Sequence, residues 1–266
     1  MKVEEIKPYS NPSEENSGSD SGGKIAGEVS ESKEKQVEQM FDNIASRYDF
    51  MNRVMSLGQH KRWRDKALRE SVSQLPPDEN LKILDVATGT GDVAFRLHEL
   101  LPAAEITGID LSDGMLEIAR KKLEDLPEES RKNITFGKGD SLSMPFHNGY
   151  FDMITVAYGV RNFSDLRRGI REMKRVLRRG GVLCIIELST PTGFLTRPLY
   201  DLYCGKVIPR LGKKYTGDEQ AYTYLPESIA ACPQRDDMAA LLYSEGFINV
   251  EWHSLSFGAL TYYIAR

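Results

Sequence analysis

The spacing of apolar residues near the start of the chain predicts two amphipathic helices. A second helical pattern runs from about residue 60 to residue 73 and ends before Pro76-Pro77, because proline lacks the amide hydrogen that a helix interior needs. We interpret residues 37–75 as an N-terminal helical cap. The apolar face of the first helix contains Val37, Met40, Phe41, Ile44 and Tyr48.

From residue 81 the pattern alternates between short apolar runs and helical segments. Ser112 has a side chain suited to the N-cap of the second helix in this series. Such an alternation predicts a doubly wound α/β fold with a mainly parallel sheet and helices on both faces. The predicted strands cover about 81–87, 105–110, 134–139, 152–157, 182–188, 246–252 and 258–265, and the predicted helices about 91–101, 113–126, 165–178 and 236–245.

Two segments depart from this alternation. Residues 1–36 are rich in Ser, Gly, Glu, Asn and Lys, and such a segment buries too little apolar surface to offset its ordering entropy. We predict a disordered tail there. Residues 190–232 are rich in Tyr, Pro and Gly and are too many for a plain connection, so we expect a helical insertion over the strand ends. Residues 37–266 then form one domain.

Charge and cysteine content narrow the class of protein. The first 36 residues carry 8 acidic and 5 basic side chains, which leaves 31 acidic and 30 basic for the rest. A nearly neutral body argues against a nucleic-acid-binding protein. Cys184, Cys204 and Cys232 have no metal-ligand spacing. We expect them to be reduced, in a cytoplasmic protein without a signal peptide or a membrane-spanning run.

The most informative motif follows the first predicted strand, where residues 85–91 read Asp-Val-Ala-Thr-Gly-Thr-Gly. Glycines let a backbone approach a ligand closely, and the next helix begins with free N–H groups. Asp110 ends the second strand, 19 residues after Gly91, where a carboxylate can accept hydrogen bonds from ribose hydroxyls. Ligands of open α/β sheets bind at this carboxyl edge. The pattern predicts a nucleoside-binding site.

Two kinds of cofactor fit this motif. Gly89, Gly91 and Ala94 also match the dinucleotide pattern G-x-G-x-x-G/A. Asp85 favours S-adenosylmethionine, because a carboxylate there can anchor the methionine ammonium, directly or through water, and would repel a pyrophosphate. A turn or cap role for Asp85 is the alternative.

A third acidic position supports the same choice. Asp140 follows the third strand and can accept from the adenine amino group, while the Ser141 N–H donates to the ring. Met115 would pack near the adenosine, or in the core. These strand-end carboxylates resemble the class I methyltransferase pattern. The predicted S-adenosylmethionine site, without a metal, consists of Asp85, Thr88, Gly89, Thr90, Gly91, Asp110, Leu111, Met115, Asp140, Ser141 and Ala157.

Several further segments resemble one family, the menaquinone/ubiquinone biosynthesis C-methyltransferases. The resemblance runs from about Val37 to the C-terminus. It departs at two places: Arg178-Arg179 stands where the family has Lys-Pro, and Ala87 stands where the wider methyltransferase loop has its first glycine. Its segments are Tyr-Asp-Phe-Met-Asn at 48–52, Ser-Leu-Gly-Gln-His at 56–60 with Trp63, Arg-Val-Leu-Arg-Arg-Gly-Gly at 175–181 with Glu-Leu-Ser at 187–189, Gly-Val-Arg-Asn at 159–162, and Tyr-Thr-Tyr-Leu at 222–225 with Ser228-Ile229.

The resemblance implies a fold and a reaction. The fold is a seven-stranded sheet with an antiparallel last strand, and the substrate is a polyprenylated quinol that lacks a ring methyl group. The Ala-Thr-Gly-Thr-Gly loop favours 2-demethylmenaquinol, with the methoxy-benzoquinol precursor of ubiquinone or another small aromatic acceptor as alternatives. A nicotinamide-dependent oxidoreductase and a non-catalytic nucleoside-binding module are competing hypotheses.

Candidate catalytic residues follow from the charge that must be stabilised. A ring carbon becomes nucleophilic when a neighbouring hydroxyl loses its proton, so the enzyme must stabilise a phenolate. Arg161, after the fourth strand, is the first candidate, with Asn162 to orient it; a structural ion pair is the alternative. His60 and Tyr224 are weaker candidates for proton transfer. The insertion also supplies tyrosines for an aromatic pocket or for lid packing: Tyr200, Tyr203, Tyr215, Tyr222 and Tyr224.

The run His-Lys-Arg-Trp-Arg at 60–64 bears on possible partners. A basic stretch with an aromatic residue can rest on anionic lipid, and a polyprenyl substrate lies in the bilayer. We therefore expect a lipophilic quinol partner and transient contact with the inner face of the membrane, with a solvated helix face as the alternative. A homo-oligomer is compatible with the sequence.

Overall fold

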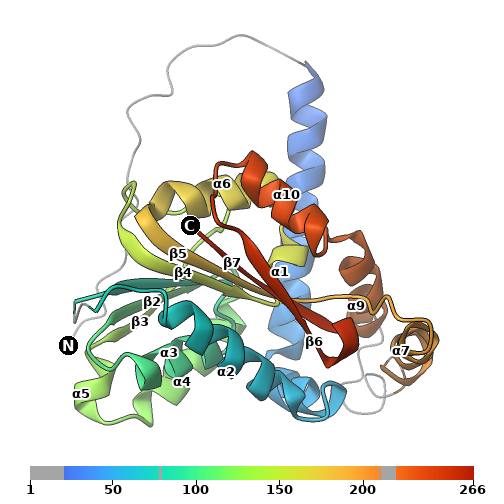
Figure 1. The fold of residues 1–266 in the computed structure, drawn as a ribbon, viewed down its shortest axis with the longest axis horizontal. Coiled ribbons are helices and arrows are strands. Elements are labelled where there is room, and N and C mark those ends of the chain that lie inside the picture. Colours follow the sequence, from blue (N-terminus) through green and yellow to red (C-terminus); the bar gives the residue numbers. More distant parts are fainter. Residues whose placement is uncertain (1–20, 78–79, 209, 211–219) are drawn as a thin grey trace.

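The computed structural model describes the backbone of residues 21–77, 80–208, 210 and 220–266, and the side chains of 35–77, 80–208, 210 and 224–266. Seven strands form one sheet in the order β3-β2-β1-β4-β5-β7-β6 (Figure 1). Strand β7 is antiparallel to both of its neighbours, and the other neighbouring strands pair in parallel. The strands are β1 (Lys82–Val86), β2 (Glu105–Asp110), β3 (Ile134–Lys138), β4 (Phe151–Ala157), β5 (Leu177–Leu188), β6 (Glu251–Leu255) and β7 (Leu260–Ala265).

Helices cover both faces of the sheet, which confirms the doubly wound fold (Figure 1). Side chains of a strand point alternately to the two faces, so Ile83 of β1 packs in one buried core and Leu84 in the other. The first core is closed by α2 (Gln59–Val72), α3 (Asp92–Leu100) and α4 (Asp113–Glu124), and the second by α6 (Leu166–Val176) and α10 (Asp236–Ser244).

Helix α1 (Ser21–Met55) is longer than the sequence pattern predicts. Residues 21–36 were expected in the disordered tail, and this prediction is wrong because they continue the helix of the cap; residues 1–20 lie outside the described residues. From Glu28 to Leu57 the chain contains neither proline nor glycine, so no helix breaker separates residues 28–36 from Val37. The first turns of α1 also include Gly22, Gly23 and Gly27, which this pattern does not explain.

Some boundaries also differ from the prediction. Helix α6 ends at Val176 rather than at Arg178, because Leu177 already pairs with Phe151 at the start of a longer β5. Strand β6 begins at Glu251 rather than near Gly246. Ser112 caps α4 as predicted, accepting a hydrogen bond from the Met115 N–H at 3.1 Å. Three short elements were not predicted: α5 (Glu128–Arg131), η1 (Val160–Asn162) and η3 (Ser256–Gly258).

From Thr196 to Ala231 the insertion is helical where the structure describes it, whereas residues 190–195 are not. It contains α7 (Thr196–Leu202), η2 (Tyr203–Val207) and α9 (Gln220–Ala231). Cys204 and Ile208 pack with Ile44 and Met51 of α1 in a third apolar cluster. The insertion and the N-terminal cap, far apart in sequence, therefore close over the same end of the sheet. All three cysteines are buried and none forms a disulfide.

Candidate active site

The carboxyl ends of the parallel strands carry the predicted cofactor residues. Asp110, the last residue of β2, accepts hydrogen bonds from the Gly89 N–H at 2.8 Å and from the Ser112 N–H at 2.9 Å. Burial raises the pKa of Asp110, and these N–H groups partly oppose that rise. The carboxylate therefore joins the loop after β1 to the loop after β2.

The Gly-rich loop between β1 and α3 turns through left-handed backbone conformations. Gly89 has φ +56° and Gly91 has φ +82°, a region that is costly for residues with a Cβ. A Cβ on Gly91 would also lie 2.8 Å from ring atoms of Phe95 and Phe136. Ala87, with φ 52°, adopts the same conformation despite its methyl group, which is a sign of strain at a functional turn.

Four of the predicted cofactor residues stabilise this loop rather than line a cavity. Asp85 is only 1% exposed and accepts hydrogen bonds from the hydroxyls of Thr88 (2.5 Å) and Thr155 (2.7 Å). Burial raises its pKa to about 6, although both hydroxyls lower it. The Thr90 hydroxyl donates to Asp49 of α1 at 2.7 Å. Two cavities lie at this end of the sheet, a small one beside the loop and a larger one under the cap, and neither is lined by Asp85, Thr88, Thr90 or Gly91. Contact between Asp85 and an ammonium therefore stays a prediction.

A small cavity of about 90 Å³ lies at this edge of the sheet. The Asp140 carboxylate lies in its wall and accepts from the Leu142 N–H at 2.8 Å. The structure thus brings together most of the residues that we predicted to hold a nucleoside. Those that line the cavity are Gly89, Asp110, Leu111, Met115, Asp140, Ser141 and Ala157.

Helix α1 forms the outer wall of the small cavity and is attached to the sheet edge by polar contacts. Asp42 accepts hydrogen bonds from the Ser112 hydroxyl (2.5 Å) and the Gly114 N–H (3.0 Å). Glu38 forms an ion pair with Lys138 at 2.8 Å. The cap therefore covers the predicted nucleoside site.

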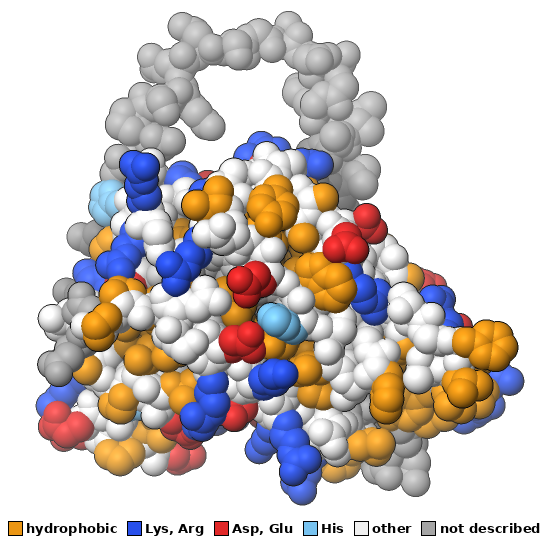
Figure 2. Space-filling view, in the orientation of Figure 1, with side chains coloured by type: hydrophobic (Ala, Val, Ile, Leu, Met, Phe, Trp, Pro, Cys, Tyr) orange, Lys and Arg blue, Asp and Glu red, His pale blue; other side chains and the backbone are white. Residues whose placement is uncertain are grey.

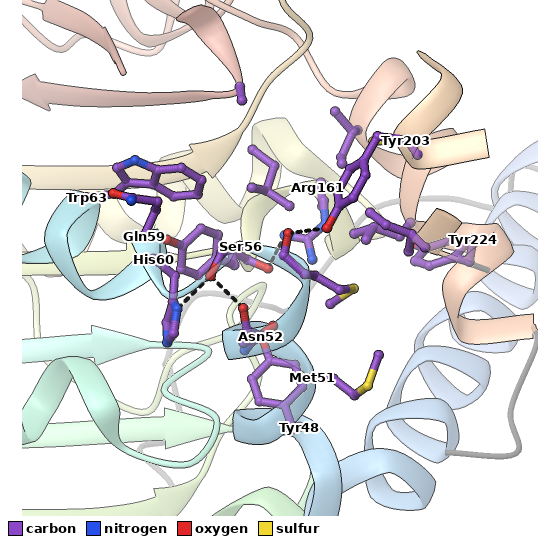
Figure 3. Close-up of a pocket in the computed structure, with 18 of the residues that line it drawn as sticks. Tyr48, Met51, Asn52, Ser56, Gln59, His60, Trp63, Arg161, Tyr203 and Tyr224 are labelled. Carbon is purple, nitrogen blue, oxygen red and sulfur yellow. Dashed lines mark hydrogen bonds between the residues drawn. The ribbon is translucent and has the colours of Figure 1, made fainter. Parts of the chain in front are cut away.

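A larger cavity of about 390 Å³ lies between the cap and the insertion (Figure 3). Its wall is mainly aromatic and aliphatic. Tyr215 lies outside the described residues, and the side chain of Tyr222 is not among those described. The lining includes Phe41, Tyr48, Met51, Met55, Trp63, Tyr158, Tyr200, Tyr203, Tyr224 and Leu225.

Arg161 lines this cavity as part of a buried ion pair. Its guanidinium is 2.7 Å from a Glu187 carboxylate oxygen, with side chains 7% and 4% exposed, and it also donates to the Tyr158 carbonyl. Burial lowers the pKa of Arg161, but the charge and hydrogen bond of Glu187 together with Tyr48 and Tyr224 outweigh it, and the net shift is upward. The cation is therefore permanent. Its orientation comes from Glu187 rather than from Asn162.

Asn162 and Tyr224 are joined by a hydrogen bond beside the Arg161–Glu187 pair. The Tyr224 hydroxyl donates to the Asn162 side-chain oxygen at 3.3 Å, and the Asn162 amide donates to the Tyr158 carbonyl at 3.4 Å. Burial raises the pKa of Tyr224, so its phenol stays protonated at neutral pH. Both side chains line the large cavity.

His60 lies in the α2 part of the wall, apart from Tyr224 (Figure 3). Its Nδ1 is 2.7 Å from the Ser56 hydroxyl oxygen, and Ser56 is hydrogen-bonded to the Asn52 carbonyl at 2.6 Å. Burial and the nearby Arg64 charge lower the pKa of His60 below its usual 6.5. His60 is therefore mostly neutral at pH 7 and able to accept a proton.

The two cavities meet at shared walls. Phe41, Tyr48, Tyr158 and Asn162 line both of them. Tyr158 has φ 59°, which is strained for an aromatic residue, and its buried hydroxyl has no hydrogen-bond partner among the described residues. A group held in one cavity can thus reach a group held in the other at this junction.

Sequence reasoning missed three residues of the site: Tyr48 and Tyr158 at the junction, and Glu187, which holds Arg161. Tyr48 was placed on the apolar face of a helix, without a role at a site. Tyr158 directly follows β4 and precedes the Gly-Val-Arg-Asn segment, which was a usable signal. Glu187 is an acidic residue within the apolar strand β5; a buried charge needs a partner, and that rule could have linked it to Arg161.

The fold and the site define the class of protein. The sheet order with its reversed β7 is that of a class I S-adenosylmethionine-dependent methyltransferase, and two adjoining cavities lie at the carboxyl edge of the sheet. A solved S-adenosylmethionine-dependent methyltransferase from Thermotoga maritima has the same fold, with a TM-score of 0.55 at 19% identity over 85% of this chain and 98% of that chain.

Residues 29–266 match the model of the ubiE/COQ5 methyltransferase family, and the chain belongs to this family. It is 43% identical to demethylmenaquinone methyltransferase of Bacteroides fragilis, over 98% of this chain and 97% of that protein. It is also 40% identical to the ubiquinone/menaquinone biosynthesis C-methyltransferase UbiE of Geotalea daltonii, over 87% of this chain and 96% of that protein. These relatives favour methyl transfer over the alternatives of hydride transfer and of a module without catalytic activity.

Proposed function

We propose that this chain transfers a methyl group from S-adenosylmethionine to a ring carbon of a polyprenylated quinol, and that 2-demethylmenaquinol is its substrate. The observation that carries the proposal is the meeting of the two cavities at Tyr48, Tyr158 and Asn162. The small cavity carries strand-end carboxylates suited to a nucleoside, while the large one is apolar, as a prenylated ring requires.

The donor site follows from the polar groups of the small cavity. S-adenosylmethionine, when bound, supplies an electrophilic methyl group on a sulfonium. Asp110 is held by two backbone N–H groups and is suited to accept from both ribose hydroxyls. Asp140 is suited to the adenine amino group, with the Ser141 N–H toward the ring. Asp85 supports the loop and acts on the methionine ammonium directly or through water.

Arg161 stabilises the charge that develops on the acceptor. When a quinol hydroxyl loses its proton, electron density moves into the ring, and the ring carbon attacks the methyl group while the carbon–sulfur bond breaks. The Arg161 guanidinium, fixed by Glu187, favours the phenolate. Arg161 Nε is buried and has no partner among the described residues, which leaves one donor for a quinol oxygen. Loss of the ring proton then restores the aromatic ring as a quinolate, which takes up one proton to become the quinol, so that one proton is released overall.

Proton removal needs a separate acceptor. A guanidinium does not give up its proton in proteins, and the Tyr224 phenol is neutral with a raised pKa. His60 is largely neutral because burial lowers its pKa, so it is able to take the hydroxyl proton through a water molecule. Asn162 and Tyr224 position the ring.

The test is a methyl-transfer assay with the purified enzyme, radiolabelled S-adenosylmethionine and two reduced acceptors, demethylmenaquinol and the demethylated methoxy-benzoquinol. We expect label in the demethylmenaquinol product. Transfer only to the methoxy-benzoquinol would mean that the substrate is the ubiquinone precursor rather than 2-demethylmenaquinol. Transfer to neither acceptor would overturn the proposal. The methoxy-benzoquinol is the second candidate substrate, because the name of the relative from Geotalea daltonii includes both the ubiquinone and the menaquinone pathway.

A further inference from the structure

Helix α7 and the residues before it expose an apolar surface next to the large cavity. Phe194 is 93% exposed, and Leu195, Leu199 and Leu202 are each more than half exposed. The three leucines are spaced by four and three residues, so they lie on one side of the helical turn. Figure 2 shows hydrophobic side chains gathered at the end of the molecule where α7 lies. Contiguous patches of this kind mark interaction surfaces.

The same helical segment faces the cavity with its other side. Tyr200, Tyr203 and Cys204 line the large cavity, and the Tyr203 hydroxyl donates to the Met55 carbonyl at 3.0 Å. The segment therefore carries apolar side chains both toward the cavity and toward solvent. The exposed leucines on its outer side have no covering among the described residues, which is the arrangement of an interaction surface.

Two turns beside the cavity expose further apolar side chains. Leu57 is 81% exposed in the turn between α1 and α2, and Phe257 is 85% exposed in η3. Both have positive φ, 51° and 59°, a conformation that costs bulky residues free energy. Leu57 and Ser256 also line the cavity, and Trp63 of α2 donates a hydrogen bond to Ser256 of η3 at 2.9 Å.

Basic side chains accompany these apolar ones. Arg53, Lys61 and Arg62 are exposed on either side of Leu57, and Arg197 and Lys206 are exposed along α7 and η2. Asp201 is the acidic residue of α7, and it pairs with Arg197 at 2.8 Å. Apolar side chains flanked by lysine and arginine are the chemistry of a surface that lies on an anionic bilayer.

We propose that this surface, formed by Leu57, Phe257 and the outer side of α7 with its basic neighbours, docks on a membrane of anionic phospholipid. The proposal rests on the proposed function, since a prenylated quinol lies in a bilayer and would enter the large cavity between α7 and the two turns. Among the described residues each helix is too short or too polar to span a membrane, so this docking is peripheral. The apolar residues enter the headgroup region, and the basic ones contact the phosphates.

Vesicle cosedimentation of the full chain tests the docking. Wild-type protein should bind phosphatidylglycerol-containing vesicles more tightly than pure phosphatidylcholine vesicles, and added salt should weaken the binding. The double variant Phe194→Glu/Leu199→Glu should bind at least about tenfold more weakly. Lys61→Ala and Arg62→Ala should each weaken binding about fivefold. Ile248→Glu is the matched control: Ile248 is 61% exposed, at the opposite sheet edge beside Arg266, and the substitution should leave binding unchanged.

A short-chain, water-soluble quinol separates this proposal from the proposed function. The variant Phe194→Glu/Leu199→Glu should methylate it at the wild-type rate, because neither residue lines a cavity. Vesicle binding without methylation of any quinol would refute the proposed function but support the proposed docking surface. Methylation with no vesicle binding, or equal binding by the variant, overturns the docking surface. Self-association of the wild type that the variant abolishes, without vesicle binding, would assign the surface to a second copy of the chain.

Discussion

The two cavities of this protein differ in how they are built. The small one is formed by loops at the tips of neighbouring strands, and its carboxylates are held by backbone N–H groups at 2.8–2.9 Å. The large one is enclosed by side chains from the cap, the insertion and two turns, and its fixed charge is the Arg161–Glu187 pair. The first is held by sheet geometry, whereas the second depends on helices that pack over the sheet.

We therefore expect the small cavity to determine the affinity for the cofactor and the large cavity to determine the rate of methyl transfer. Backbone-held carboxylates suit a cofactor whose shape does not vary, because strand tips leave them little freedom. An apolar cavity with a single ion pair suits an acceptor that is mostly hydrocarbon and gains charge only during the reaction. Substitutions at the two places should therefore affect different measurements.

The largest expected effect is on turnover. Arg161→Ala should lower kcat by about 100-fold or more, the scale of losing a group that stabilises developing charge, while affinity for S-adenosylmethionine stays unchanged. Rapid-quench assays and calorimetry measure the two quantities. A variant with wild-type turnover would remove Arg161 from the mechanism.

The substitution also leaves Glu187 buried without its partner, which costs about 3–5 kcal/mol of stability. The double variant Arg161→Leu/Glu187→Gln removes that cost and should remain inactive. Arg178→Ala is the matched control, because it breaks a second arginine–carboxylate pair, with Asp152, that lines neither cavity. It should keep the wild-type kcat.

A pH effect on folding should come from Asp85. Burial raises its folded-state pKa from 3.8 to about 6, so the folded protein holds this proton more tightly than the unfolded chain. The resulting stabilisation is complete below about pH 4 and is lost as the pH rises through 6, a total of about 3 kcal/mol. Urea unfolding of ligand-free protein at pH 4.5 and pH 7 should show this loss relative to Asp85→Asn, and Asp125→Asn serves as the exposed control.

Cofactor affinity should respond at the small cavity. Asp110→Ala should weaken S-adenosylmethionine binding by about 1–3 kcal/mol, the scale of losing a hydrogen-bonded charge, with little change in KM for the quinol. Isothermal calorimetry measures the affinity. Asp125, exposed at the end of α4, provides the control Asp125→Asn. Unchanged affinity in Asp110→Ala would refute the ribose assignment.

The smallest effect should come from the contact between cap and sheet edge. Glu38→Gln removes the ion pair with Lys138, whose side chains are 29% and 49% exposed. Exposed pairs contribute little, so we expect S-adenosylmethionine to bind about twofold more weakly at low salt and equally at high salt. Stopped-flow measurement of cofactor release tests this, and a change larger than tenfold would mean that the ion pair controls closure of α1.

Much of the fold was predictable because its signals are local. The alternation of apolar runs predicted all seven strands, and β2 was predicted to the residue. Boundaries failed where pairing overrode the local pattern, as at Leu177, whose pairing with Phe151 extended β5. The helix over residues 21–36 was missed because composition was given more weight than the absence of helix-breaking residues after Gly27.

The sequence by itself determined the sheet, its Gly-rich turn and the carboxylates at its edge, because each depends on the periodicity and turn chemistry of residues close along the chain. Only the tertiary structure decided that Glu187 holds Arg161, that Tyr48 and Tyr158 form the junction, and that Asp85 lies behind the loop. The residues concerned are far apart along the chain: 26 positions for Arg161 and Glu187, 70 for Asp85 and Thr155, and 110 for Tyr48 and Tyr158. The pairing of neighbouring strands brings the first two pairs together, and the packing of the cap over the sheet brings the third, so residues close along the chain do not specify them.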